Sequence, residues 1–363
     1  MRQILPEPAS LHQRAVANCS AHAGLLRFGL LFYALLTLTG CDSTAWENGL
    51  SRYLGGAARI LEQSLHKPLA PKPISVPPTQ SKIRLGQQAE HRLDLLEYLK
   101  TTPCALHQLI SERNSSLGQF AADSTRLIYD VDFLQQVDAC IKALSQENPE
   151  LADRLTKAAA DKREGLPALL RTTILRGTEY RLFWKSPQTL GDYPAKVQSD
   201  LEVDIKGLVA DIGPISNGTY KGSASDLDTK LSGFKRGEGG LMLTAWEDVF
   251  VSLTVVNKMI IAFQKKRPLC YLERTNPRAE QFRALVRTIF IGRIQPQISA
   301  LNRRTYALMP LLRQLEDDLG ASADPDFRSF IEARDQRIAA GRQALRDHVA
   351  LIGDLFKSCG GLL

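Results

Sequence analysis

Residues 127–144 read LIYDVDFLQQVDACIKAL, and their apolar side chains return every three or four positions. This spacing places them on one face of an α-helix of about five turns. Residues 241–263, LMLTAWEDVFVSLTVVNKMIIAF, repeat the pattern over a longer run. Neither stretch alternates between apolar and polar residues as a half-buried strand does. The two stretches therefore indicate a helical core.

Helix boundaries can be placed along the rest of the chain from capping residues and prolines. Three sites pair a capping residue with a proline suited to a first turn: Asn148-Pro149, Asn276-Pro277 and Asp324-Pro325. Gly213-Pro214 is expected to end a helix that begins at Leu201, and Pro296 to kink or restart its helix. The chain has no alternating strand runs and no Asn-Gly hairpins between strands. The sequence predicts an all-α, multi-helix, bundle-like body.

Seven glycines fall within residues 213–240, where we expect the least regular part of the body. A short helix from Ser225 to Leu231 is predicted to interrupt it. Gly237-Glu238-Gly239-Gly240 precedes a helix and weakly resembles a phosphate-binding loop. No strand precedes it and no Gly-Lys-Ser/Thr follows, so an ordinary loop is the favoured interpretation.

The N-terminal region resembles a bacterial lipoprotein signal peptide. Arg27 precedes an apolar run over 28–38, which closes with Leu38-Thr39-Gly40-Cys41. The alternative, a transmembrane helix, needs about 20 apolar residues, more than this run offers. The resemblance implies that residues 1–40 are removed, that Cys41 is lipidated and that the protein is exported. Asp42 then stands where such proteins commonly carry an inner-membrane retention signal, so the inner membrane, facing the periplasm, is favoured over the outer membrane.

Residues 41–81 are predicted to form a lipid-anchored helix followed by a Pro-rich tether. Apolar residues recur at helical spacing from Trp46 to Leu65, and this helix either lies on the bilayer or, as we favour, packs on the body. Five prolines then fall between Pro68 and Pro78, which is typical of a semi-rigid spacer. Residues 66–81 would span about 50 Å if fully extended and would separate the anchor from an α-helical domain over 82–363.

The cysteines that remain after removal of the leader suit an oxidising compartment. They are Cys41 for the lipid, and Cys104, Cys140, Cys270 and Cys359. No CxxC is present, and Cys104 with His107 forms an isolated C-x-x-H, so we expect no metal site. Antiparallel packing of the predicted helices favours pairing Cys104 with Cys140 and Cys270 with Cys359. Two disulfides would then staple the body.

Charge offers little evidence for a nucleic-acid partner. Without residues 1–40 the chain has 43 basic and 38 acidic residues, a net charge of +5. We interpret the basic residues as alternating with acidic ones throughout, rather than forming the stripe of a nucleic-acid surface. A weak affinity for anionic lipid headgroups remains compatible with this charge.

Residues 104–118, CALHQLISERNSSLG, form the segment of the body that is richest in polar residues. Glu112, Arg113 and Asn114 are candidate ligand-binding residues for an anionic or carbonyl group; the favoured alternative is an internal ion pair and a helix end. Arg334, Arg342 and Arg346 lie near one face of the last helix, among acidic residues. A solvated face is the default interpretation of these arginines.

The string Glu112 to Gly118, the lipobox and the cysteine placement resemble an uncharacterised family of proteobacterial lipoproteins, known as a domain of unknown function. That resemblance implies an envelope lipoprotein and supplies no activity, cofactor or catalytic residue. A non-catalytic scaffold or binding protein with envelope protein partners is the favoured function. The alternatives are a hydrolase or lyase acting on an envelope polymer, and a carrier of lipid or another apolar ligand.

Overall fold

The structure is a computed structural model that describes residues 45–64, 76–78, 95–102, 104–115, 121–197 and 200–361. The chain divides into two units, Met1–Ser43 and Thr44–Leu363, and the described residues all belong to the second. The leader, Cys41, Asp42 and most of the Pro-rich segment lie outside the described residues. Among the described residues there is no strand, which confirms the all-α prediction.

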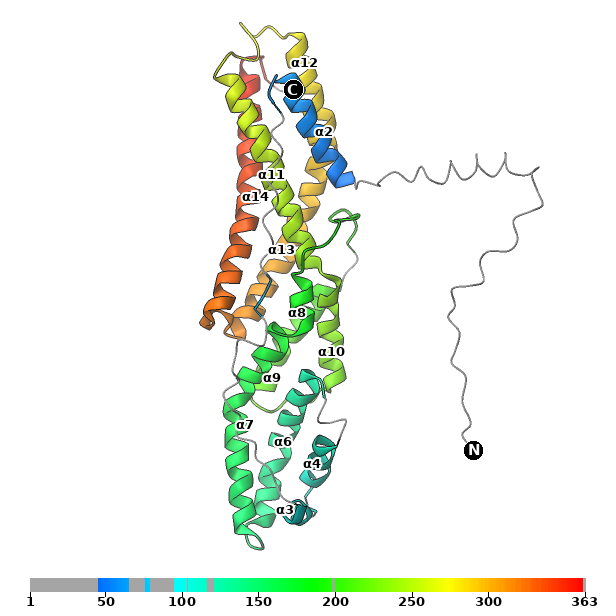
Figure 1. The fold of residues 1–363 in the computed structure, drawn as a ribbon, viewed down its shortest axis with the longest axis vertical. Helices are drawn as coiled ribbons and strands as arrows, with labels where there is room; N and C mark the ends of the chain where they lie inside the picture. The colour runs from blue at the N-terminus through cyan, green and yellow to red at the C-terminus, as the bar shows by residue number, and fades with distance from the viewer. Residues whose placement is uncertain are drawn as a thin grey trace, which may run out of the picture. The chain divides into compact units, whose positions relative to one another are not determined.

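Twelve α-helices are described, and Figure 1 labels them. They are α2 (Ala45–Ile60), α3 (Leu95–Lys100), α4 (Leu106–Asn114), α6 (Asp123–Leu144), α7 (Pro149–Leu175), α8 (Thr178–Phe183), α9 (Leu201–Ser216), α10 (Ala224–Ser232), α11 (Glu238–Gln264), α12 (Pro277–Leu285), α13 (Gln295–Asp318) and α14 (Pro325–Lys357). Two 3₁₀ turns, Gly233–Arg236 and Ala321–Ala323, and a π-helix, Val286–Ile294, connect some of them.

The predicted capping residues start their helices as expected. The side-chain oxygens of Asn148 and Asn276 accept hydrogen bonds from backbone N–H groups three residues on, at 3.2 and 3.0 Å. Asp324 accepts from the N–H of Asp326 at 3.0 Å. Each of these bonds satisfies a donor that the first turn leaves without a helical partner.

Two helix pairs dominate the packing. The long helices α11 and α14 make the most extensive contact, and α6 packs along α7 as an antiparallel hairpin. Figure 1 shows the hairpin at one end of the unit and α11, α14 and α2 at the other. The run Ala224–Gln264 is long and apolar enough to cross a membrane, yet 61% of its most apolar window is buried inside the unit. α11 is thus the central core helix of its end.

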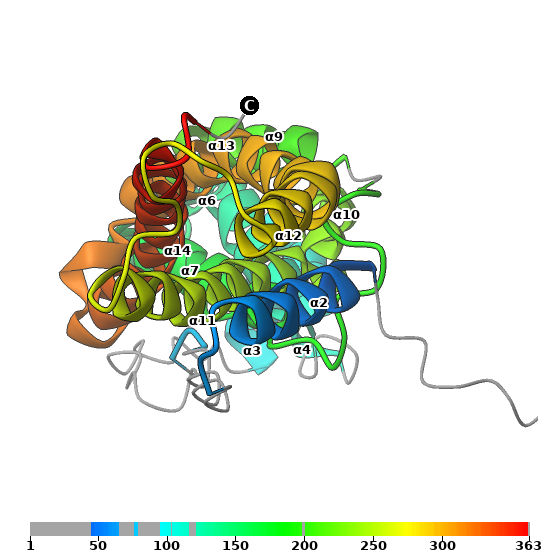
Figure 2. The ribbon, with the colours of Figure 1, turned by 90° about the horizontal axis from the view of Figure 1, so that it is seen from above.

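Helix α2 is part of the core. Trp46, Leu50, Tyr53 and Ala57 are buried, and the helix packs on α11, α12 and the π-helix, as Figure 2 shows from above. Of the two placements left open by the sequence, the structure has the packed one. The Pro-rich segment therefore does not separate an anchor helix from the body, because α2 precedes that segment and lies in the same unit as the later helices.

The expectation of irregular structure over 213–240 holds only for residues 217–223, and the short helix predicted from Ser225 to Leu231 is confirmed as α10. Helix α9 continues through Pro214 to Ser216, α10 covers 224–232, and α11 begins at Glu238. Glycine here serves close packing: a Cβ on Gly240 would lie 1.8 Å from the carbonyl oxygen of Lys185. At Gly237 it supplies the positive φ of 69° between the 3₁₀ turn and α11.

Pro296 restarts a helix, as predicted, without separating it from its neighbours. α12, the π-helix and α13 follow one another without a break, and Pro296 lies in the first turn of α13. A proline N cannot donate to the preceding turn, and its ring crowds the carbonyl four residues earlier. The wider π-helical turn directly before Pro296 accommodates both effects.

Candidate functional site

The predicted cysteine pairs are confirmed. Cys104 bonds Cys140 and Cys270 bonds Cys359, with Cα atoms 5.3 and 5.1 Å apart. His107 of the C-x-x-H lies next to the first disulfide but stacks on Tyr98, 4.2 Å between ring centroids, and contacts the Thr101 hydroxyl. Among the described residues, no group of three His, Cys, Asp or Glu side chains could hold a metal ion.

The candidate ligand-binding residues Glu112, Arg113 and Asn114 form the last turn of α4. Glu112 accepts a hydrogen bond from Gln108 at 3.1 Å, and the Arg113 guanidinium lies 5.8 Å from the Tyr129 ring centroid. Helix α4 ends at Asn114, as the alternative interpretation expected. The pocket described below does not include these residues, so a ligand at this helix end stays a prediction.

The interpretation of Arg334 as part of a solvated face is wrong. Its side chain is fully buried, donates to the carboxylates of Glu316 and Asp335, and lies over the Trp184 ring at 5.1 Å. Glu316 also accepts from the Tyr180 hydroxyl. Arg346 does stay exposed, bonded to Gln343, while Arg342 is half-buried over Tyr306. Arg334 thus compensates a buried carboxylate inside the bundle.

The Gly-Glu-Gly-Gly segment is a helix start with a buried carboxylate. Glu238 forms a two-bond ion pair with Arg304 of α13, whose remaining nitrogen donates to Glu202 of α9 at 2.6 Å. Charge-assisted bonds of this kind replace the water that burial removes from the carboxylate. The segment therefore joins three helices, and the phosphate-loop resemblance has no structural counterpart.

A chain of three buried polar side chains joins α2, α14 and α11. The amide of Asn257 donates to the carbonyl of Ala344 at 3.3 Å, which turns its oxygen toward His348. His348 Nδ1 therefore donates to Asn257 Oδ1 at 2.6 Å, and Nε2 accepts from the Tyr53 hydroxyl at 2.9 Å. Burial lowers the pKa of His348 to about 3, so its ring is neutral near pH 7.

A second polar contact ties the start of α2 to α11. The Trp46 indole N–H donates to Asp248 Oδ2 at 3.0 Å. Desolvation raises the pKa of Asp248 to about 6, and the bond from Trp46 opposes that rise. Together with Tyr53, Trp46 anchors both halves of α2 to the core.

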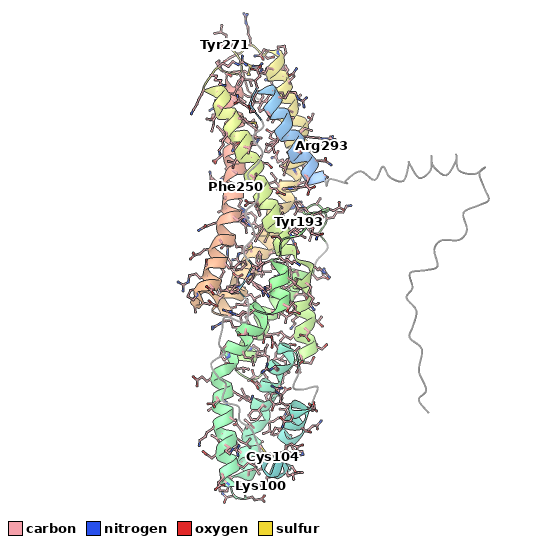
Figure 3. The ribbon with its side chains drawn as sticks, viewed as in Figure 1. Lys100, Cys104, Tyr193, Phe250, Tyr271 and Arg293 are labelled. Carbon is pink, nitrogen blue, oxygen red and sulfur yellow. A yellow bond between two sulfur atoms is a disulfide. The ribbon has the colours of Figure 1, made fainter. Side chains whose placement is uncertain are left out.

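The largest local excess of positive charge lies in a segment that the sequence interpretation missed. Residues 265–304 contain ten Lys or Arg and two Glu, so the view that basic and acidic residues alternate throughout is wrong here. A simple count in a 40-residue window would have found it. The exposed Arg287 and Arg293 of the π-helix make no ion pair with any residue in the described part of the chain. Arg293 is labelled in Figure 3 beside the start of α2.

Helix α2 adds two exposed arginines to this region. Arg52 and Arg59, two turns apart on its outward face, also lack an ion-pair partner among the described residues. A shallow groove of about 490 Å³ lies between α2 and the helical run of α12 and the π-helix. Both arginines line it, with Ser51, Gln281 and Thr288 as further polar groups. We call Arg52, Arg59, Arg287 and Arg293 the basic edge; its charge and hydrogen-bond donors suit anionic headgroups.

Residues 50–362 match a family described as a protein of unknown function, DUF3080. The chain belongs to this family. The match runs from α2 to the chain's C-terminal residues, so the family's shared region includes the basic edge, both disulfides and the buried Tyr53–His348–Asn257 chain. No curated protein and no solved structure matches the chain. The DUF3080 description assigns no activity to any of these features.

Proposed function

We propose that this protein is a lipoprotein of the bacterial cell envelope that acts as a non-catalytic scaffold or binding protein at a membrane surface. The lipid would be attached to Cys41 after removal of residues 1–40, and the body would face the periplasm. The Leu38-Thr39-Gly40-Cys41 sequence supports this proposal. The pairing of all four later cysteines is also expected of an exported chain.

The position of α2 is the observation that carries the proposal. Ala45, its first residue, lies four positions after Cys41, and α2 is built into the core. Four extended residues span at most about 14 Å. A lipid on Cys41 would therefore hold the body directly against the bilayer, with Arg52 and Arg59 of the basic edge on the same helix. This arrangement suits a protein that works at the membrane surface.

The observations favour a binding role over the two alternatives. A hydrolase or lyase would be favoured by a carboxylate with a raised pKa in an open pocket, but none of the described carboxylates with a raised pKa, Asp132, Asp204 and Asp248, lines the groove of the basic edge. A lipid carrier would need a tunnel between helices. The long helices instead enclose large buried side chains such as Trp184 and Trp246.

Lipidation can be tested with labelled palmitate. Cys41→Ser should leave an uncleaved precursor without label, because no other residue supplies the thiol at that position. Equal incorporation in wild type and variant would contradict the proposal. Density-gradient fractionation then tests the membrane: the inner membrane is expected, and an outer-membrane position that Asp42→Ser leaves unchanged would contradict the sorting role of Asp42.

The binding role needs its own measurement. Affinity purification of the lipidated protein from cross-linked, solubilised membranes should recover an envelope protein in a fixed ratio to it. Recovery of the chain alone would contradict a scaffold function while leaving the anchor intact.

A further inference from the structure

The loop between α11 and α12 presents two apolar side chains to solvent. Tyr271 is 64% exposed and Leu272 is 91% exposed, at the end of the unit where Figure 3 labels Tyr271. Leu272 is the most exposed large apolar residue that the structure describes. Isolated exposed apolar residues are common, but two adjacent ones at a turn form a small exposed apolar patch. We call residues 270–274 the tip.

The tip is held in a conformation that its own residues disfavour. Leu272 and Glu273 have φ angles of 52° and 58°, and the N–H of Arg274 donates to the carbonyl of Tyr271 at 3.0 Å. Turns with two successive positive φ angles usually carry Asn and Gly. The disulfide Cys270–Cys359 fixes one side of the tip to the end of α14. A strained turn that displays apolar side chains is a feature expected of a binding element.

Basic residues flank this small apolar patch in the sequence. Lys265, Lys266 and Arg274 are exposed and make no ion pair with any residue in the described ranges. Glu273 is the one acidic residue between 265 and 274. An apolar tip with a basic collar has the chemistry of a loop that enters the interface of an anionic bilayer.

We propose that the tip inserts Tyr271 and Leu272 into the interfacial region of a bilayer that contains anionic phospholipid. This inference rests on the proposed membrane-anchored function and adds a second contact with the same membrane. Tyrosine suits this depth because its ring is apolar and its hydroxyl stays with the headgroups. The collar lysines and Arg274 would contact the phosphate groups.

The second contact orients the body. Glu62, just past α2, pairs with Arg267 at 2.7 Å and with Arg278, so the C-terminal end of α2 lies next to the tip. The N-terminal end of α2 is about 24 Å away along the helix axis and within about 14 Å of Cys41. A bilayer that holds both the lipid and the tip therefore runs along α2. The outward-facing Arg52 and Arg59 would then face the headgroups. Because they have no acidic partner among the described residues, their guanidinium groups are available to bind lipid phosphates.

A tryptophan reporter tests the insertion. The three native tryptophans are buried, so Leu272→Trp adds the exposed indole. The full lipidated protein is reconstituted into vesicles of phosphatidylcholine and phosphatidylglycerol with brominated acyl chains, and wild-type fluorescence is subtracted. We expect the added fluorescence to fall at least about twofold on anionic vesicles. Replacing Lys265, Lys266 and Arg274 by Gln in the same protein should remove most of this quenching.

Val203→Trp is the matched control. Val203 of α9 is 68% exposed, and its neighbours Glu202 and Asp204 are acidic. Its indole should not be quenched. Equal quenching at both positions, or equal quenching on pure phosphatidylcholine, would overturn the inference. The inference would also be overturned if brominated lipid did not quench the added indole of the vesicle-bound Leu272→Trp protein, and if only the addition of another protein shielded that indole from solvent. Protein that does not float with the vesicles at all would instead contradict the anchor.

Discussion

At the scale of single residues, the core depends on polar side chains that satisfy one another. Arg334 with Glu316, Arg304 with Glu238, and Arg176 with Asp324 each place a buried charge beside its opposite. His348 is buried without a charged partner and is therefore neutral. The Arg304–Glu238 and Arg176–Asp324 pairs join segments that are distant in sequence, whereas Arg334 and Glu316 join the consecutive helices α14 and α13. These residues therefore help to determine which helices pack together.

His348 should make the stability of the fold depend on pH. The unfolded chain binds a proton at this ring below about pH 6.5, whereas the folded chain does not until about pH 3. The free energy of unfolding should therefore fall as the pH is lowered through this window, by at most about 1.4 kcal/mol per pH unit from this group. Urea unfolding of wild type and His348→Phe at several pH values between 7 and 4 measures the effect.

The His348→Phe protein is expected to be less stable at pH 7, because Tyr53 and Asn257 lose their partner. Its stability should also fall less steeply with acid than that of the wild type. Parallel curves for the two proteins would show that His348 protonates equally in both states, contrary to this expectation.

The sequence predicted the disulfides better than the buried charges. Cysteine pairing follows from helix ends that meet in a hairpin, which local signals define well. Arg334 was misinterpreted because an arginine usually marks the solvated face of a helix. It lies four residues before buried Ile338 and four after buried Phe330, so its position in the apolar stripe was the available signal. Its partner Glu316 belongs to another helix, which no local pattern identifies.

At the scale of helices, α11 and α14 are in close contact at one glycine. A Cβ on Gly341 would lie 2.7 Å from both the ring carbon Cε3 and the backbone oxygen of Trp246. Because one of these atoms belongs to the backbone, the neighbour cannot simply rotate away. At this position the two helices can pack so closely because residue 341 lacks a side chain.

Gly341→Ala should destabilise the protein by about 2–3 kcal/mol despite the better helix propensity of alanine. Gly353→Ala on the same helix meets nothing within 4 Å and should stabilise it by about 0.5–1 kcal/mol. Thermal unfolding of the two variants makes the comparison. A stabilised Gly341→Ala protein would mean that the two helices can separate at no cost.

Helix starts were predictable and glycine-rich stretches were not. Asn148, Asn276 and Asp324 act through bonds within their own first turn, so the sequence is sufficient. Glycine is ambiguous: it permits irregular backbone, but it also permits helices to touch, as at Gly240. The π-helix before Pro296 was also not predictable, because it depends on how α12, the π-helix and α13 continue into one another without a break.

At the scale of the whole unit, the two disulfides join segments that are separated in the sequence. Cys104–Cys140 holds α4 to α6, and Cys270–Cys359 holds the tip to the end of α14. Their sequence separations are 36 and 89 residues. Closing loops of this length restricts the unfolded chain by about 4 kcal/mol each. The candidate membrane contacts and the disulfide of the tip thus share one end of the unit.

Cys270→Ser/Cys359→Ser should lower the free energy of unfolding by up to about 4 kcal/mol. The Cys104→Ser/Cys140→Ser pair should have a similar effect at the other end. Denaturant unfolding without reductant gives both values, and adding reductant to wild type should approach their sum. A variant within 0.5 kcal/mol of wild type would show that its bridge does not constrain the unfolded chain.

The place of α2 in the unit was open from sequence because the prolines after it indicated a spacer. Its apolar stripe predicted a buried face, yet a membrane could have covered that face equally well. The hydrogen bonds that place α2 in the core involve partners 200 to 300 residues away in sequence. Trp46 bonds Asp248, and Tyr53 bonds His348. Contacts of that separation have no local signature.

This position also sets an order of events during biosynthesis. Among the described helices α2 leaves the ribosome first, whereas α11, α12 and α14, which contact it, emerge much later in translation. The apolar face of α2 must therefore wait for most of the chain, and closing so long a loop is slow. A nascent chain halted before residue 277 would lack α12, the π-helix and α14, and the apolar face around Tyr53 would stay partly uncovered, so α2 is a segment that a chaperone would protect until these helices are made.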